Sequence, residues 1–180
     1  MNQPVLIDRG ALMDAVIGQV GRCPELADQT YVLASADWLN GEFASAYFDF
    51  LSLFDLLDWE PESNDCDKFA TWAGAVATAL HSRTRKKYGH APSALAFGVW
   101  FYKPDWSPSN HAIRWFAYGV PVDEAHPQGV AVGFYEPNGR QRHVVELSKA
   151  EINSCFKCAA YSPSFSSPSL SVAARRSRPP

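Results

Sequence analysis

The sequence Asn64-Asp-Cys-Asp-Lys-Phe-Ala70 marks the point where a loop is expected to become a helix. Turn-forming and helix-capping residue types precede Cys66. Apolar residues then recur at helical spacing; they are Phe69, Trp72, Ala73, Val76, Ala77 and Leu80. Cys66 is therefore predicted at a helix N-terminus, where free backbone N–H groups and the helix dipole favour a thiolate. A buried thiol without a chemical role is the alternative interpretation.

Two predicted strands downstream supply the partners that a nucleophilic cysteine needs. His111 begins one apolar run, and Glu136 ends the next. A nucleophile requires a base, and the base requires an acceptor that fixes its tautomer. Cys66, His111 and Glu136 are therefore the candidate nucleophile, base and orienting acid. His126 is an alternative base, but it lies in a predicted loop.

This order of residues resembles that of the papain-like and transglutaminase-like thiol hydrolases. Three short motifs carry the resemblance: Asp65-Cys66-Asp67-x-Phe69-Ala70, His111-Ala112 and Tyr135-Glu136-Pro137. They are most similar to the protease domain at the C-terminus of a fungal mushroom agglutinin and to its small bacterial and phage relatives. The resemblance spans residues 30–158. It implies a papain-like fold and a Cys-His-Glu triad that cleaves a peptide or protein substrate through a thioester.

The resemblance also raises the questions of the oxyanion hole and of a metal. Papain-type enzymes place a Gln shortly before the cysteine, and residues 59–64 contain none. Asn64 is the candidate replacement, together with the backbone N–H of Cys66. The agglutinin domain depends on calcium, which makes Asp65 and Asp67 candidate metal ligands, since hard cations prefer several oxygen ligands. Capping of the helix is the alternative role for both aspartates; the sequence itself requires no cofactor.

The composition is that of an ordinary globular domain. The chain has 180 residues, 47% of them hydrophobic and 19% charged, with a net charge of −3. Nucleic-acid binding is therefore not expected. No apolar run approaches the roughly 18 residues of a membrane span, and the first residues lack a secretion-signal pattern. No membrane association and a cytoplasmic location are the resulting expectations.

Helical spacing dominates the first half of the chain, and strand-like runs dominate the second. The predicted helices cover 6–20, 38–57, 66–82 and 148–156, and the predicted strands 95–102, 111–119, 129–136 and 141–147. Asp37 is the predicted cap of the second helix, and Asn138-Gly139 predicts a two-residue hairpin turn. The expected fold is α+β, with a helical N-terminal half on an antiparallel sheet of four or five strands. Residues 1–158 are expected to form this single domain, and the Ser/Pro/Arg-rich residues 159–180 a flexible tail.

Other functions stay open on the sequence alone. The missing Gln, the small size and the aromatic-rich segment 38–57 fit a phage or bacterial binding or counter-defence module, with a host protein as its target. Acyl transfer to an amine would use the same three residues as hydrolysis. Cys155 and Cys158 have the spacing of a metal or redox pair, but no second pair of ligands completes a zinc site.

Overall fold

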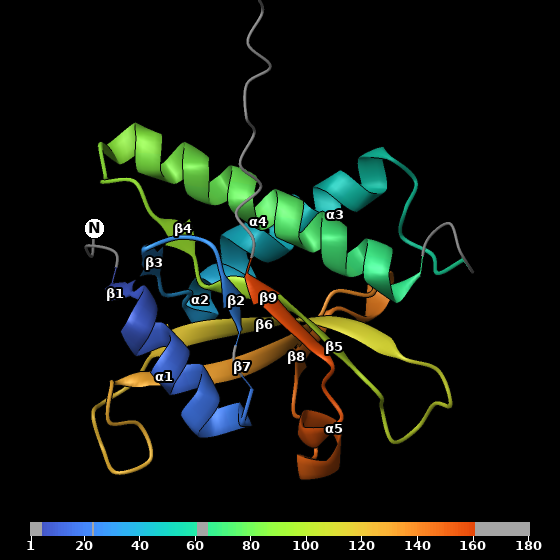
Figure 1. Cartoon of the computed structure of the whole chain (residues 1–180). Coiled ribbons are helices and arrows are strands. Elements are labelled where there is room, and N and C mark those ends of the chain that lie inside the picture. The colour runs from blue at the N-terminus through green and yellow to red at the C-terminus, as the bar shows by residue number, and fades with distance from the viewer. Residues whose placement is uncertain (1–4, 23, 61–64, 161–180) are drawn as a thin grey trace, which may run out of the picture.

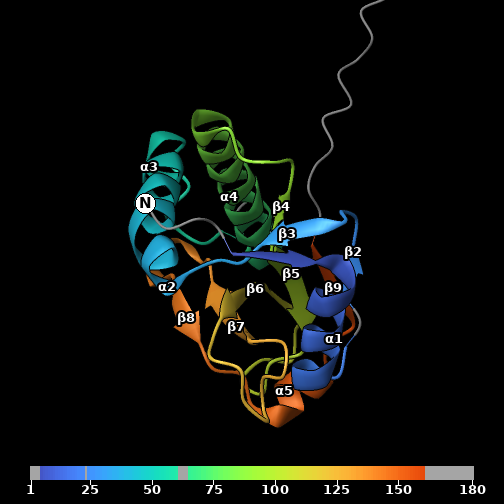
Figure 2. The same cartoon turned by 90° about the vertical axis from the view of Figure 1, so that its left-hand side faces the viewer.

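The computed structural model describes residues 5–22, 24–60 and 65–160, and its architecture is α+β (Figure 1). A six-stranded sheet forms the centre of the molecule. Helices α4 (Cys66–Tyr88) and α3 (Ala44–Leu53) lie on one side of this sheet, and α1 (Arg9–Val20) lies on the other, as Figure 2 also shows. A cluster of buried apolar side chains lies on each side. The predicted fold class is therefore confirmed.

The central sheet has the strand order β2-β9-β5-β6-β7-β8. Its strands are β2 (Glu25–Leu26), β9 (Lys157–Ala160), β5 (Phe97–Tyr102), β6 (His111–Gly119), β7 (Val130–Glu136) and β8 (His143–Val145). All neighbours are antiparallel except β2 and β9, which run parallel. A second, three-stranded sheet contains β1 (Leu6–Asp8), β3 (Thr30–Val32) and β4 (Ala94–Leu95), with β3 and β4 parallel. The central sheet is therefore antiparallel, as predicted, apart from the parallel β2–β9 pair, and it has six strands where four or five were predicted.

The first two helices begin where capping side chains dictate. Asp8 accepts a hydrogen bond from the backbone N–H of Ala11, so α1 begins at Arg9 and the residues before it form β1 rather than helix. The second helical run consists of α2 (Ala36–Trp38), a π-helical turn η1 (Leu39–Phe43) and α3. Its cap is Ser35, whose hydroxyl accepts from Trp38 N, and not the predicted Asp37, which lies in the first turn.

Helix α4 begins at Cys66, as predicted, and extends to Tyr88, where Gly89 ends it in a left-handed conformation. Its buried face consists of Phe69, Ala70, Ala73, Ala77 and Leu80, which keep the predicted helical spacing. This amphipathic helix is the longest in the described residues. None of the helices described there has the length and hydropathy required to cross a membrane.

The C-terminal half departs from the prediction at its connections. The predicted two-residue hairpin turn is replaced by a short 3-10 helix, η2 (Gly139–Gln141), before β8. Gly139 has a φ of 37°, and a Cβ there would collide with the carbonyl oxygen of Leu57, so packing against an earlier loop decides this turn. Helix α5 (Lys149–Asn153) has the capping box of Ser148 and Glu151. Strand β9 extends to Ala160, two residues into the segment predicted as a tail, and residues 161–180 lie outside the described part.

Candidate active site

The three predicted catalytic residues come from the ends of three packed elements. Cys66 is the first residue of α4, His111 is the first residue of β6, and Glu136 is the last residue of β7. Because β6 and β7 are antiparallel neighbours, the start of one lies beside the end of the other. Helix α4 packs on β6, which brings its N-terminus to the same region. The structure therefore brings the predicted triad together.

His111 and Glu136 form a short hydrogen bond. Nε2 of His111 lies 2.6 Å from Oε2 of Glu136, and the imidazole is only 7% exposed. The second carboxylate oxygen, Oε1, accepts a hydrogen bond from the backbone N–H of Asn138 at 3.0 Å. Glu136 is thereby fixed at both oxygens. Its contact with Nε2 leaves Nδ1 as the nitrogen that faces the thiol of Cys66.

The charge of His111 follows from these contacts. Burial disfavours the protonated ring, but the hydrogen bond to Cys66, followed by the hydrogen bond and negative charge of Glu136, outweighs it. Together they raise the pKa of His111 to about 9 from its ordinary value of 6.5. At neutral pH the ring therefore carries its proton beside the sulfur. An imidazolium next to a thiolate is the arrangement of an activated cysteine nucleophile.

Two buried side chains hold the elements of the site in place. The hydroxyl of Tyr47, on α3, lies 3.0 Å from the carbonyl oxygens of Phe69 in α4 and of Pro137 after β7, and it shares its proton between them. The guanidinium of Arg114, on β6, donates to the carbonyl oxygens of Ala70 in α4 and Phe97 in β5. Burial lowers the pKa of Arg114 to about 9. Both residues tie the first turns of α4 to the sheet.

Two aromatic rings contact the imidazole, and the sequence analysis singled out neither. Tyr102 lies opposite His111 in the β5–β6 register, with ring centroids 5.8 Å apart. Trp106, in the connection between these strands, meets the same ring edge-on at 5.4 Å and is 71% exposed. Pairing the predicted strands 95–102 and 111–119 as a hairpin would have placed Tyr102 there. No periodic pattern indicates Trp106, because it lies in an irregular loop.

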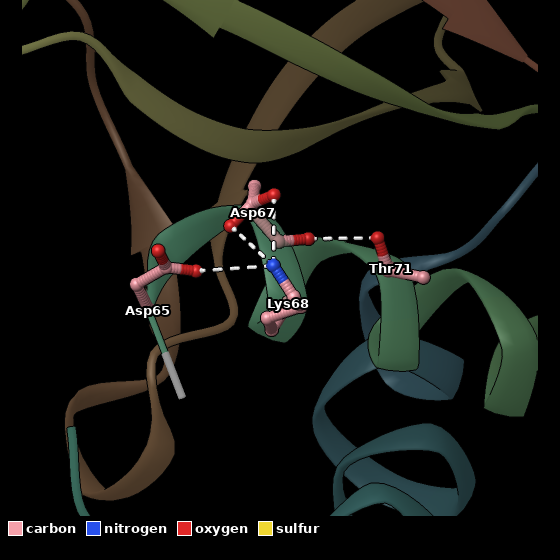
Figure 3. A network of polar contacts seen from close by, with 4 residues as sticks. All are labelled: Asp65, Asp67, Lys68 and Thr71. Atoms are coloured by element: carbon pink, nitrogen blue, oxygen red, sulfur yellow. Dashed lines mark hydrogen bonds and ion pairs between the residues drawn. The ribbon is translucent and has the colours of Figure 1, made fainter. Parts of the chain in front are cut away.

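The two aspartates beside the nucleophile both contact a lysine (Figure 3). Lys68 Nζ lies 3.3 Å from Oδ2 of Asp67 and 3.9 Å from Oδ1 of Asp65. A hydrogen bond between the two carboxyl groups raises the pKa of Asp65 and lowers the pKa of Asp67. Asp65 occupies the N-cap position of α4, but its side chain makes no capping hydrogen bond. The side chain of Asp65 therefore does not cap the helix.

The remaining candidates lie apart from the triad or outside the described residues. Asn64, the proposed oxyanion donor, falls in the segment 61–64, which the structure does not describe. His126 pairs with Asp123 at 3.0 Å in the exposed connection between β6 and β7. Cys155 is buried, and burial raises the pKa of its thiol to about 11. Among the described residues, no group of three or more His, Cys, Asp or Glu side chains is arranged to hold a metal ion.

Comparisons with known proteins give a likeness in fold. One solved structure, a PSL1a–E64 complex, superposes with a TM-score of 0.56 at 17% identity, over 86% of this chain and 50% of the other. A second is the Polyporus squamosus lectin bound to a human-type influenza-binding epitope, Neu5Acα2-6Galβ1-4GlcNAc. Its TM-score is 0.60 at 17% identity, over 86% of this chain and 49% of the lectin chain. The fold is mushroom-agglutinin-like.

This likeness agrees with the agglutinin expectation at the level of fold. The chain spans about half the length of the solved lectin chains that it matches. No protein-family model matches the sequence, and a search of curated proteins also found no match.

The raised pKa of His111 gives a first prediction. Glu136→Gln keeps the size of the side chain but removes its charge, so the pKa of His111 is expected to fall from about 9. An NMR titration of the imidazole in both proteins measures this change. Because the pKa is raised in the folded state, the His111 contribution to stability is present below pH 6.5 and is lost as the pH rises through about 9. An unchanged pKa in the variant would contradict the proposed contact.

Proposed function

We propose that this protein is a papain-like thiol hydrolase that cleaves an amide bond in a peptide or protein. The observation that carries the proposal is the relay Cys66–His111–Glu136, in which one imidazole bridges a helix-terminal thiol and a partly buried carboxylate. This is the geometry of nucleophile, base and orienting acid. A reducing, cytoplasmic setting is part of the proposal, because it would keep the sulfur of Cys66 reduced.

The proposed reaction proceeds in two steps. The Cys66 sulfur attacks the carbonyl carbon, and the tetrahedral intermediate collapses when His111 gives its proton to the leaving amine. This leaves a thioester. His111 then takes a proton from water, the hydroxide attacks the thioester, and the acid leaves as the thiolate forms again beside the protonated imidazole. Glu136 holds the imidazole in one orientation throughout both steps.

The developing oxyanion requires hydrogen-bond donors near the sulfur. The first backbone N–H groups of α4 have no partner within the helix, and the N–H of Cys66 is among them. These groups, together with Asn64, are the proposed oxyanion donors. Calcium, which the agglutinin resemblance implies, would require Asp65 and Asp67 as ligands. Of the described residues, only these two carboxylates lie there, and an ammonium group already contacts both.

A structural neighbour provides further support for the thiol chemistry. PSL1a was solved as a complex with E64, which is an epoxide that alkylates thiols. The shared fold makes E64 a suitable probe of this chain. Among the cysteines that the structure describes, we expect E64 to modify Cys66 alone, since Cys155 and Cys158 are buried.

The labelling experiment compares the wild-type protein with Cys66→Ser. Intact mass and peptide mapping identify the modified residue after incubation with E64 at neutral pH. The variant is expected to lose the adduct that maps to position 66, and its buried Cys155 and Cys158 are expected to stay unmodified. If wild-type Cys66 stays unmodified while the protein is folded, the proposed function is wrong.

A binding function is the second candidate, and three exposed apolar side chains close together in the sequence favour it. Leu53, Phe54 and Trp59, at and after the end of α3, are 78%, 59% and 55% exposed. Exposed apolar side chains that lie near one another in the sequence are typical of a surface that contacts another protein. In this alternative the domain engages a host protein as a phage or bacterial counter-defence module. The binding would then be independent of Cys66.

A further inference from the structure

We propose that Lys68 acts as a tethered cation beside the nucleophile, so that Cys66 reacts without a bound metal ion. In this role Lys68 is a positioning residue that offsets the negative charge of Asp65 and Asp67. The inference rests on the proposed function, since it concerns the reactivity of the Cys66 thiol. It goes beyond that function because it names what controls the electrostatic environment of the thiol.

The ammonium group of Lys68 lies within 4 Å of the carboxylates of both Asp65 and Asp67. Lys68 Nζ contacts both oxygens of Asp67, at 3.3 and 3.5 Å, and lies 3.9 Å from Oδ1 of Asp65. Figure 3 shows the ammonium group between the two side chains. Oδ1 of Asp65 is buried and accepts no hydrogen bond from the described residues. Lys68 therefore provides the positive charge next to Oδ1 of Asp65, an oxygen that solvent does not reach.

The geometry of the helix explains how Lys68 reaches the carboxylate of Asp65. Lys68 lies three residues after Asp65, so both side chains share one face of the first turn of α4. The hydroxyl of Thr71 donates to the carbonyl oxygen of Asp67 at 2.7 Å, which adds a bond to this turn. The ammonium group thus reaches back toward the residues that flank Cys66.

The chemistry requires a positive charge at this place. Negative charge develops on the sulfur and on the substrate carbonyl oxygen during attack, and two neighbouring carboxylates oppose it. The Lys68 ammonium compensates part of their charge. The lysine is 43% exposed, so solvent screens the interaction and a moderate effect is expected.

The same geometry does not fit a calcium site. Calcium takes about six to eight oxygen ligands. In the described residues, the two aspartates provide the only carboxylates here, and the ammonium group occupies the space between them. A cation could bind both aspartates only if Lys68 moved away. The residues present therefore favour an internal cation over a bound one.

The test measures the rate at which iodoacetamide, a neutral reagent, alkylates Cys66. The variants are Lys68→Gln and a matched control, Lys86→Gln, which removes the same charge from the far end of α4. Each protein is assayed with a chelator and with added calcium. We expect the wild type and Lys86→Gln to react equally in both conditions. Lys68→Gln should react roughly fivefold more slowly in chelator, as expected for a partly exposed ion pair, and should regain rate with calcium.

Two results would overturn the inference. One is a wild-type rate that rises with calcium and falls with chelator, and the other is a Lys68→Gln rate equal to that of the wild type. Calorimetry with calcium alone gives a second, independent readout. Calcium binding by the wild type that Asp67→Asn removes would also contradict a tethered cation. Failure of the proposed function has a different signature, because Cys66 would then be unreactive in every protein.

Discussion

Cys66→Ala should lower the cleavage of a peptide or protein substrate by about 1,000-fold or more, while the fold is retained. The thiol is the only group of the triad that bonds to the substrate, so no other side chain replaces it. Cys66 lies at the surface end of α4 and is partly exposed, and its removal should leave the core unchanged. Turnover of the substrate and circular dichroism of both proteins measure the two parts of this prediction.

A second cysteine provides the matched control. Cys155 is a thiol of the same size outside the triad, so Cys155→Ala should retain activity. His111→Ala should lose activity to a similar extent as Cys66→Ala, because residues that act as a unit are not additive. If Cys66→Ala keeps the full biological activity, the binding module is the correct function and hydrolysis is not.

Gly98→Ala is expected to destabilise the fold by about 3 kcal/mol, which is near the upper end for overpacking of a core. Gly98 lies in β5, opposite Trp115 of β6 and beside β9. A Cβ at this position would collide with the indole of Trp115 and with the carbonyl oxygen of Ala159. Neither neighbour can move freely, because one is a fully buried ring and the other is backbone. Thermal unfolding measures the effect, and the melting temperature should fall by roughly 10 °C.

A glycine-to-alanine substitution at position 18 should stabilise the fold rather than destabilise it. Gly18 lies on the exposed side of α1, and a Cβ there meets no atom within 4 Å. Alanine in a helix interior is favoured over glycine by about 0.5–1 kcal/mol, so Gly18→Ala should raise the melting temperature. Equal effects of the two substitutions would contradict the packing described for β5.

The sequence predicted the triad because its residues carry local signals. Helical spacing places Cys66 at a helix start, and the apolar runs place His111 and Glu136 at strand ends, all of which the structure shows. The strand 111–119 was predicted at its exact bounds. Such signals depend only on neighbours in the chain.

Features that depend on distant contacts were missed. The turn at Gly139 is set by the carbonyl oxygen of Leu57, and Tyr47 reaches both Phe69 and Pro137. The short strands β2 and β4 have two residues each and carry no periodicity. The sequence analysis gave Lys68 no role, since its contacts with Asp65 and Asp67 require the folded first turn of α4.

Strand β9 determines when the molecule can be completed during synthesis. It lies between β2 and β5, so its hydrogen bonds join Glu25 to Ala159 and Val99 to Ala159. Loops of this length are slow to close, because their ends must meet before any contact stabilises them. A ribosome-bound chain that lacks β9 (Lys157–Ala160) leaves one edge of β5 without its partner. We therefore expect the three candidate residues of the site to reach their final rigidity only after nearly the whole described chain has left the ribosome.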